Sequence, residues 1–188
     1  MRALVLDVDA VVHARRPGLV PEIEALILSL PGRAYMERSV YRREAARSGL
    51  LPQLETWQRA NLLDVAVDYR ALPDGDRRFR ALTTQPQWRA LSRPDRATLV
   101  VATDLEDAGV LTCERLLAGA VRAHRRRAID LFDIVRVSFA TGHLTRSRAD
   151  EMCAEWDRDR FSAGRPIDYA GTFDQELRRR HAVDPLPF

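Results

Sequence analysis

The chain has 188 residues, of which 46% are hydrophobic and 30% charged, and its formal net charge at pH 7 is +3. This balance is typical of one globular domain with a buried core, and it indicates a local basic surface rather than a polybasic protein. All 30 basic residues are Arg, so no lysine amine is available for catalysis or Schiff-base chemistry. Two cysteines without a CxxC partner, and no apolar run of 18 residues, favour a reduced, cytoplasmic protein that crosses no membrane.

Short apolar runs alternate with helical patterns along most of the chain. We expect strands at 3–6, 32–36, 62–72, 110–112 and 128–130. We expect helices at 21–30, 37–47, 52–60, 95–108, 114–126, 131–141, 145–161 and 172–181. The pattern also predicts a charged turn at 73–80, helix ends at Gly109 and Gly142, an N-cap at Thr145 and a joint at 162–166.

This alternation predicts an α/β fold with a mainly parallel central sheet and helices on both of its faces. In open α/β sheets the working site lies at the carboxyl ends of the strands. Polar residues that end strands are therefore the first candidates for function. Asp7 ends the first expected strand, and Glu114 follows the strand at 110–112.

Four acids stand out by their position relative to these elements: Asp7, Glu44, Asp95 and Glu114. If the fold gathers them, their carboxylates cannot all stay charged without compensation. The usual compensation is one or two hard divalent cations such as Mg²⁺ or Mn²⁺. Such ions can activate a water and stabilise an in-line phosphoryl displacement, which is nuclease chemistry.

Several segments, in their order along the chain, resemble the PIN domain, the PilT N-terminal ribonuclease fold of many bacterial toxin–antitoxin toxins. The segments are "LVLDVDAVV", "YMERSVYRRE", "PDRATLVVATDLEDAGVLTCERL" and "RAIDLFDIV". The resemblance covers about residues 1–135, and "ATGHLTRSRADEM" is similar to the helical tail of longer PIN-like proteins. It implies a PIN-like nuclease domain at 1–137, and a helical C-terminal extension at 138–188 that packs on the same domain.

The resemblance implies a metal-dependent endoribonuclease that hydrolyses RNA phosphodiester bonds. Asp7, Glu44, Asp95 and Glu114 take the positions of the catalytic acids and metal ligands, with Asp9 as a supporting ligand. The family usually has Asp where this chain has Glu114, which is a departure. Partners to consider are RNA, a small antitoxin protein and a second copy of the chain. The arginines near the acids are suited to phosphate recognition: Arg15, Arg16, Arg42, Arg43, Arg96 and Arg115.

Two other functions and a purely structural role stay open at this point. "LDVDAVV" also fits a haloacid-dehalogenase-like phosphatase with Asp7 as nucleophile and Asp9 as general acid, although that family normally uses a lysine that this chain lacks. The departure at Glu114 and the helical tail fit a catalytically degenerate PIN-like module that binds RNA or protein. Each acid also has a structural explanation, because Asp and Glu are favoured at helix starts and in helix ion pairs.

Overall fold

The computed structural model describes residues 1–158 and 169–183, with side chains at 1–158 and 171–179. Five parallel strands form one sheet with the order β3-β2-β1-β4-β5. The strands are β1 (Ala3–Leu6), β2 (Ala34–Tyr35), β3 (Leu63–Asp64), β4 (Ala108–Leu111) and β5 (Arg127–Ile129). The prediction of an α/β fold with a parallel central sheet is confirmed.

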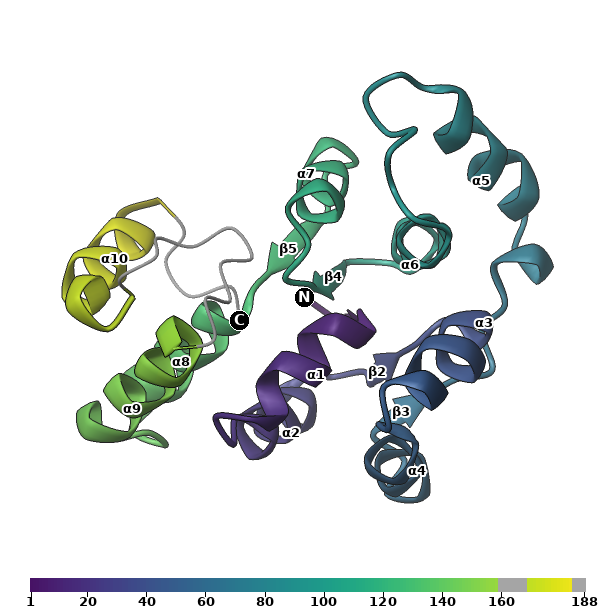
Figure 1. The fold of residues 1–188 in the computed structure, drawn as a ribbon. Helices are drawn as coiled ribbons and strands as arrows, with labels where there is room; N and C mark the ends of the chain where they lie inside the picture. Colours follow the sequence, from purple (N-terminus) through teal and green to yellow (C-terminus); the bar gives the residue numbers. More distant parts are fainter. Residues whose placement is uncertain (159–168, 184–188) are drawn as a thin grey trace.

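The helices connect these strands and cover both faces of the sheet. In chain order they are α1 (Val8–Arg15), α2 (Val20–Ser29), α3 (Arg38–Val40), the π-helix η1 (Tyr41–Ala45), α4 (Leu51–Arg59), the 3₁₀ helix η2 (Tyr69–Ala71), α5 (Gly75–Thr84), α6 (Arg93–Asp104), α7 (Arg115–Ala123), α8 (Leu131–Ala140), α9 (Arg146–Arg158) and α10 (Tyr169–Val183). Figure 1 shows α6 and α7 on one face and α1, α2 and α4 on the other. In the described part of the chain, no helix combines the length and apolar character that crossing a membrane requires.

The central strands are buried on both faces, as a continuously apolar run predicts. All four residues of β1 and all four of β4 are buried, and they pair in register from Ala3 with Ala108 to Leu6 with Leu111. The sheet is short at the other edge, because β2 and β3 pair over two residues each. The pairing of β1 with β4, over four residues, is therefore the longest in the sheet.

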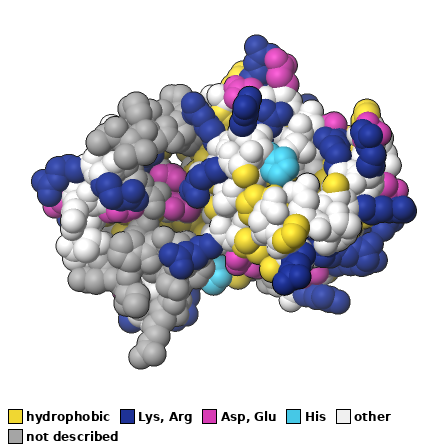
Figure 2. All heavy atoms as spheres, turned by 90° about the horizontal axis from the view of Figure 1, so that it is seen from above, with side chains coloured by type: hydrophobic (Ala, Val, Ile, Leu, Met, Phe, Trp, Pro, Cys, Tyr) yellow, Lys and Arg dark blue, Asp and Glu magenta, His cyan; other side chains and the backbone are white. Residues whose placement is uncertain are grey.

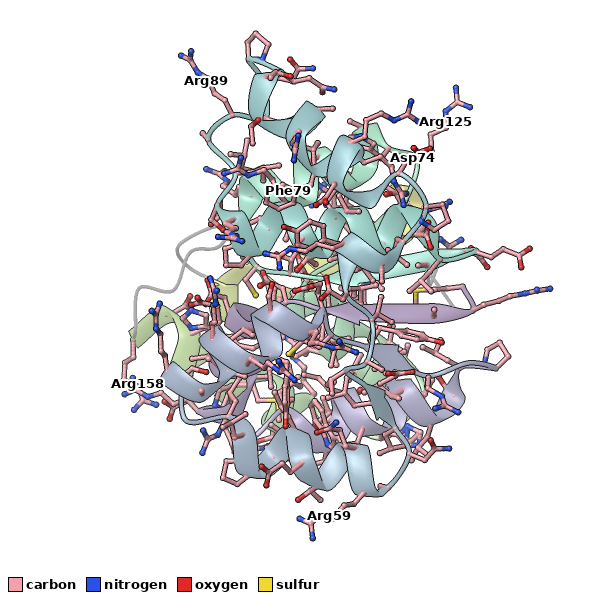
Figure 3. All side chains as sticks on the ribbon, turned by 90° about the vertical axis from the view of Figure 1, so that its right-hand side faces the viewer. Arg59, Asp74, Phe79, Arg89, Arg125 and Arg158 are labelled. Atoms are coloured by element: carbon pink, nitrogen blue, oxygen red, sulfur yellow. The ribbon has the colours of Figure 1, made fainter. Side chains whose placement is uncertain are left out.

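Two expectations for the middle of the chain are wrong. The segment at 62–72 is a strand only at Leu63–Asp64 and then forms η2. The charged segment at 73–80 is not a turn throughout, because α5 begins at Gly75. Phe79 explains the helix, since its ring stacks on Tyr69 with 4.6 Å between centroids and points into the molecule in Figure 3. The charges of the segment mark the outer face of an amphipathic helix.

The expectation that Gly109 ends a helix is also wrong. The helix ends earlier, at Asp104, and Gly109 lies inside β4 between Leu4 and Arg127 of the neighbouring strands. A Cβ atom at this position would lie 2.3 Å from the Met1 sulfur and 3.2 Å from Ile129 Cδ1. Glycine therefore serves close packing in a strand rather than helix termination.

The C-terminal helices pack beside β5 and α1. Phe173 of α10 is fully buried and makes edge-to-face contacts with Phe132 and Phe139 of α8, at 5.4 and 5.7 Å. Trp156 Nε1 of α9 donates to the backbone oxygen of His13, at 3.1 Å. The predicted domain boundary at 137/138 falls inside α8, and the predicted joint at 162–166 lies outside the described residues.

Candidate active site at the carboxyl edge of the sheet

Asp7 lies where the strand order of the sheet reverses. The chain adds β2 and β3 on one side of β1, and β4 and β5 on the other. Open α/β sheets bind ligands at such a switch point, outside the carboxyl ends of the strands. The Asp7 amide donates to the backbone oxygen of Leu111, and Thr112 Oγ1, just after β4, donates to Asp7 Oδ2 at 2.7 Å. The carboxylate is thus fixed across the two strands of the switch point.

The surroundings of Asp7 disfavour its charge. Its side chain is 5% exposed, and burial raises the pKa of the Asp7 carboxyl from 3.8 to about 7. The hydrogen bond from Thr112 acts in the opposite direction, while the charges of Asp95 and Asp9 raise the pKa further. Asp7, Asp9 and Asp95 are therefore electrostatic neighbours.

Asp95 and Glu114 both serve as helix-capping groups. Asp95 Oδ2 accepts from the Ser92 amide at 3.0 Å, which completes a capping box at the start of α6. Glu114 is exposed, and its Oε1 accepts from the Leu116 amide at the start of α7. The Glu114 amide donates to Thr112 Oγ1 at 3.0 Å. The backbone of Glu114, rather than its carboxylate, joins the hydrogen bonds around Asp7.

Glu44 lies in the π-helix η1, between α3 and α4. Its carboxylate is 34% exposed and lies 3.5 Å from Arg47 on the next turn. Single π-helical turns are rare and are frequent at functional sites. The ion pair agrees with an ordinary helix-surface role, so only the unusual turn distinguishes Glu44 from a structural residue.

Two further acids at this edge were not predicted. Glu37 follows β2, is fully buried, and caps α3. Asp130 follows β5 and caps α8 through a capping box with Asp133. The pKa of the buried Cys113 thiol is raised, first by burial and then by the charges of Asp130 and Asp7, which places both acids near it. The rule that polar residues ending strands mark the site would have found both acids.

The described residues contain no preformed metal-binding site built from several side chains. Among them, no three His, Cys, Asp or Glu side chains are arranged to hold one metal ion. Mg²⁺, however, usually takes only one or two carboxylates from a protein and completes its shell with waters and substrate phosphates. The buried Asp7 carboxylate, with Asp95 as its acidic neighbour, fits this kind of shared site because no residue in 1–158 or 171–179 forms an ion pair with it. A closed four-carboxylate site does not fit these residues.

The arginines predicted to bind RNA lie mainly on the surface. Arg42, Arg43 and Arg115 are exposed, and Arg15 donates to the backbone oxygen of Gly49. Arg96 instead lies over the Phe79 ring, with its guanidinium carbon 5.4 Å from the ring centroid. Arg16 pairs with Glu155 at 3.9 Å. On the face shown in Figure 2, basic side chains are spread around the rim with acids between them. That face shows no continuous patch of basic side chains.

No family model, curated protein or solved structure matches the chain. The resemblance to the PIN domain, the metal, and the RNA and protein partners therefore stay predictions. Their support is the order of the sequence motifs and the geometry around Asp7.

Proposed function

We propose that this protein is a PIN-like ribonuclease that depends on Mg²⁺ or Mn²⁺, with its centre at Asp7. One observation carries the proposal. A carboxylate that is 5% exposed lies at the switch point of a parallel sheet, beside two other acids, and makes no ion pair with any residue that the structure describes. Buried acids with strongly raised pKa values at the carboxyl edge of a sheet are typical of functional sites.

The residues at the switch point have distinct roles in this proposal. Asp7 and Asp95 would hold the cation, with Asp9 as a neighbouring carboxylate. The bound cation supplies charge neutralisation for the phosphodiester and lowers the pKa of a coordinated water. Thr112 orients Asp7 by donating to its Oδ2, and the backbone of Asp9 also donates to this carboxylate. The Glu114 amide in turn fixes the Thr112 hydroxyl.

A groove along the short edge strand β3 offers a path for the RNA backbone. It has a volume of about 560 Å³, and three guanidinium groups, from Arg33, Arg38 and Arg42, line it together with Tyr41. Arg38 donates to the backbone oxygen of Ala66, whereas Arg42 is exposed. Arginine suits phosphate contacts, and an aromatic ring can stack on a base.

A second candidate is a PIN-like module that binds RNA without cutting it. The positions of Glu44 and Glu114 favour it, because one carboxylate pairs with Arg47 and the other caps α7. In this case the cation would be dispensable, and RNA binding would rest on arginines alone. The phosphatase interpretation of Asp7 and Asp9 would instead require a covalent phosphate on Asp7.

Cleavage of a fluorescent single-stranded RNA tests the proposal. We expect cleavage with Mg²⁺ or Mn²⁺, none with excess EDTA, and a loss of at least about 100-fold in Asp7→Asn. Glu55→Gln, a matched change at an exposed position on α4, should cleave normally. RNA binding without cleavage in any metal would favour the non-catalytic module. Acid-stable labelling of Asp7 by a phosphate donor would favour the phosphatase.

A further inference from the structure

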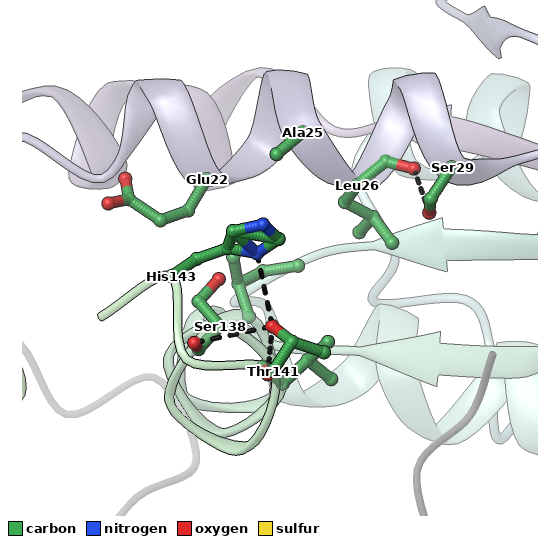
Figure 4. Close-up of a pocket in the computed structure, with 9 residues that line it drawn as sticks. Glu22, Ala25, Leu26, Ser29, Ser138, Thr141 and His143 are labelled. Atoms are coloured by element: carbon green, nitrogen blue, oxygen red, sulfur yellow. Dashed lines mark hydrogen bonds between the residues drawn. The ribbon is translucent and has the colours of Figure 1, made fainter. Parts of the chain in front are cut away.

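A groove runs between α2 and α8, separate from the carboxyl edge of the sheet. Each helix contributes one face with the spacing i, i+3, i+4 and i+7. The lining residues are Glu22, Ala25, Leu26 and Ser29 from α2, and Ile134, Val137, Ser138 and Thr141 from α8 and its end. His143, just after α8, lies below Glu22 and Ala25 in Figure 4. The groove therefore joins two helices that are far apart in the sequence.

Small side chains leave the space between the two helices unfilled. Ala25 and Ser29 on α2, together with Ser138 and Thr141 at α8, are small, and the larger lining side chains leave a cavity beside them. The cavity measures about 80 Å³. A water-sized group needs roughly 10–15 Å³ on this measure, so the cavity holds a ligand of about five to eight heavy atoms. Its walls are mainly aliphatic, which favours a ligand with a short apolar body.

Glu22 is the one lining residue that carries a carboxylate, and one of its oxygens lacks a partner. Oε2 is buried and has no hydrogen bond from the described residues. The chain has 30 arginines, yet within residues 1–158 and 171–179 no ion pair to Glu22 is present. An unpaired buried acceptor is unfavourable, and more so when it is charged. The site therefore gains most from a ligand that brings donors and a positive charge.

The hydroxyl groups in the groove strengthen this preference. Ser29 Oγ donates to the backbone oxygen of Leu26 at 2.7 Å. Thr141 Oγ1 donates to the backbone oxygen of Val137 at 2.9 Å and lies 3.1 Å from His143 Nδ1. Because both hydroxyl groups donate to backbone oxygens, the Ser29 oxygen can accept from a ligand, whereas the Thr141 oxygen already has His143 Nδ1 as a neighbour. Acceptor-rich polar groups above aliphatic walls match an ammonium group on a short carbon chain.

We propose that this groove binds a small primary ammonium ion with an apolar stem of about four carbons, anchored by Glu22. The ammonium group donates to Glu22 Oε2, and the stem lies against Leu26, Ile134 and Val137. Binding at this groove is independent of the proposed ribonuclease function, because no residue near Asp7 takes part.

Titration of the isotope-labelled full-length chain, followed by amide NMR shifts, tests the proposal with n-butylammonium chloride as the probe. We expect saturable shifts at Ala25, Ser29, Ser138 and Thr141. We also expect n-butanol, which has the same size and no charge, to bind at least tenfold more weakly at equal ionic strength. Equal binding of the two probes, no saturable shift, or shifts only outside the groove would overturn the proposal.

Two variants separate the anchor from the cavity. Glu22→Gln keeps the shape of the anchor and removes its charge, so it should weaken butylammonium binding at least tenfold, whereas Glu55→Gln should not. Ala25→Leu fills the groove from an exposed position on α2 and should weaken binding equally while leaving the melting temperature unchanged. Unchanged binding in either groove variant contradicts the assignment. An unaltered amide spectrum outside the groove confirms that each variant is folded.

Discussion

Two buried carboxylates follow neighbouring strands of the sheet, and they have opposite environments. Glu37 follows β2 and is fully buried; Asp7 follows β1 and is 5% exposed. Glu37 accepts four hydrogen bonds, from the Ser39 amide and hydroxyl, the Val40 amide and the Tyr69 amide. Asp7 accepts from the Thr112 hydroxyl and the Asp9 backbone, and it faces the charges of two other acids.

The difference shows that burial alone does not tell a structural acid from a functional one. Donors aimed at Glu37 satisfy its buried carboxyl oxygens, and they tie the start of α3 to η2, thirty-two residues further along the chain. For Asp7, burial outweighs the hydrogen bonds from the Thr112 hydroxyl and the Asp9 backbone, so the pKa of this acid is raised to about 7. An acid left without compensation at a switch point is available for a ligand that supplies positive charge.

Removal of the Glu37 carboxylate should have the largest effect on stability. Glu37→Ala leaves buried donors unsatisfied and opens a cavity, so we expect a loss of about 3–4 kcal/mol in the free energy of unfolding. Urea unfolding followed by circular dichroism measures it. Ser39→Ala removes a single donor hydroxyl and should cost only about 1 kcal/mol. Equal losses in both variants would contradict the role of Glu37 as a shared acceptor.

Replacement of Asp7 by Asn should raise the stability of the fold, whereas replacement of Glu37 by Ala lowers it. Because its folded pKa is raised, the stability that protonated Asp7 contributes is fully present below about pH 4 and is lost as the pH rises to about 7. Asp7→Asn stays neutral at every pH. Without metal, the free energy of unfolding of Asp7→Asn should exceed that of the wild type at both pH values. The difference should be on the order of 2 kcal/mol larger at pH 8 than at pH 5.

The control for this prediction is Glu55→Gln, which changes an exposed acid on α4 that is not among the groups acting on the pKa of Asp7. Its stability relative to the wild type should vary little between the two pH values. A pH-independent difference between Asp7→Asn and the wild type in urea unfolding would show that the buried carboxyl is compensated after all.

The smallest effect concerns the basic groove on the Glu37 side of the sheet. Arg42→Ala should weaken RNA binding several-fold and reduce the slope of log affinity against log salt by about one, because one phosphate contact is lost. Fluorescence anisotropy at several salt concentrations measures this slope. Arg89→Ala is the matched control, since Arg89 projects from the far end of the molecule in Figure 3. An equal effect of both variants would place the RNA elsewhere.

The sequence was most informative where the chain is apolar and regular. The run Ala3–Leu6 and the helix after Pro94 follow from local pattern, because buried strands and capped helices carry their signals within a few residues. The helix α5 was missed because its apolar contact, Phe79 on Tyr69, is tertiary and its outer face is highly charged. Gly109 was misinterpreted because the atoms that crowd it come from other parts of the chain.

The candidate site was predictable in part for the same reason. The rule that acids ending strands face the working edge identified Asp7, and helix-start chemistry identified Asp95. The local pattern could not reveal that Thr112 would bond to Asp7 across 105 positions, or that the Glu114 carboxylate would cap its own helix. Nor could it separate Glu37 from Asp7, since their donors are set by the tertiary fold.

The pKa of Asp7, measured by NMR of its side-chain carboxyl carbon with and without Mg²⁺, tests the central claim most directly. Without metal, the account predicts a pKa near 7, and with saturating Mg²⁺ a fall of at least two units, since a bound cation favours the charged form. The same titration in Asp95→Asn should show a smaller fall. A pKa near 3.8 without metal, or a pKa that Mg²⁺ leaves unchanged, would contradict the account.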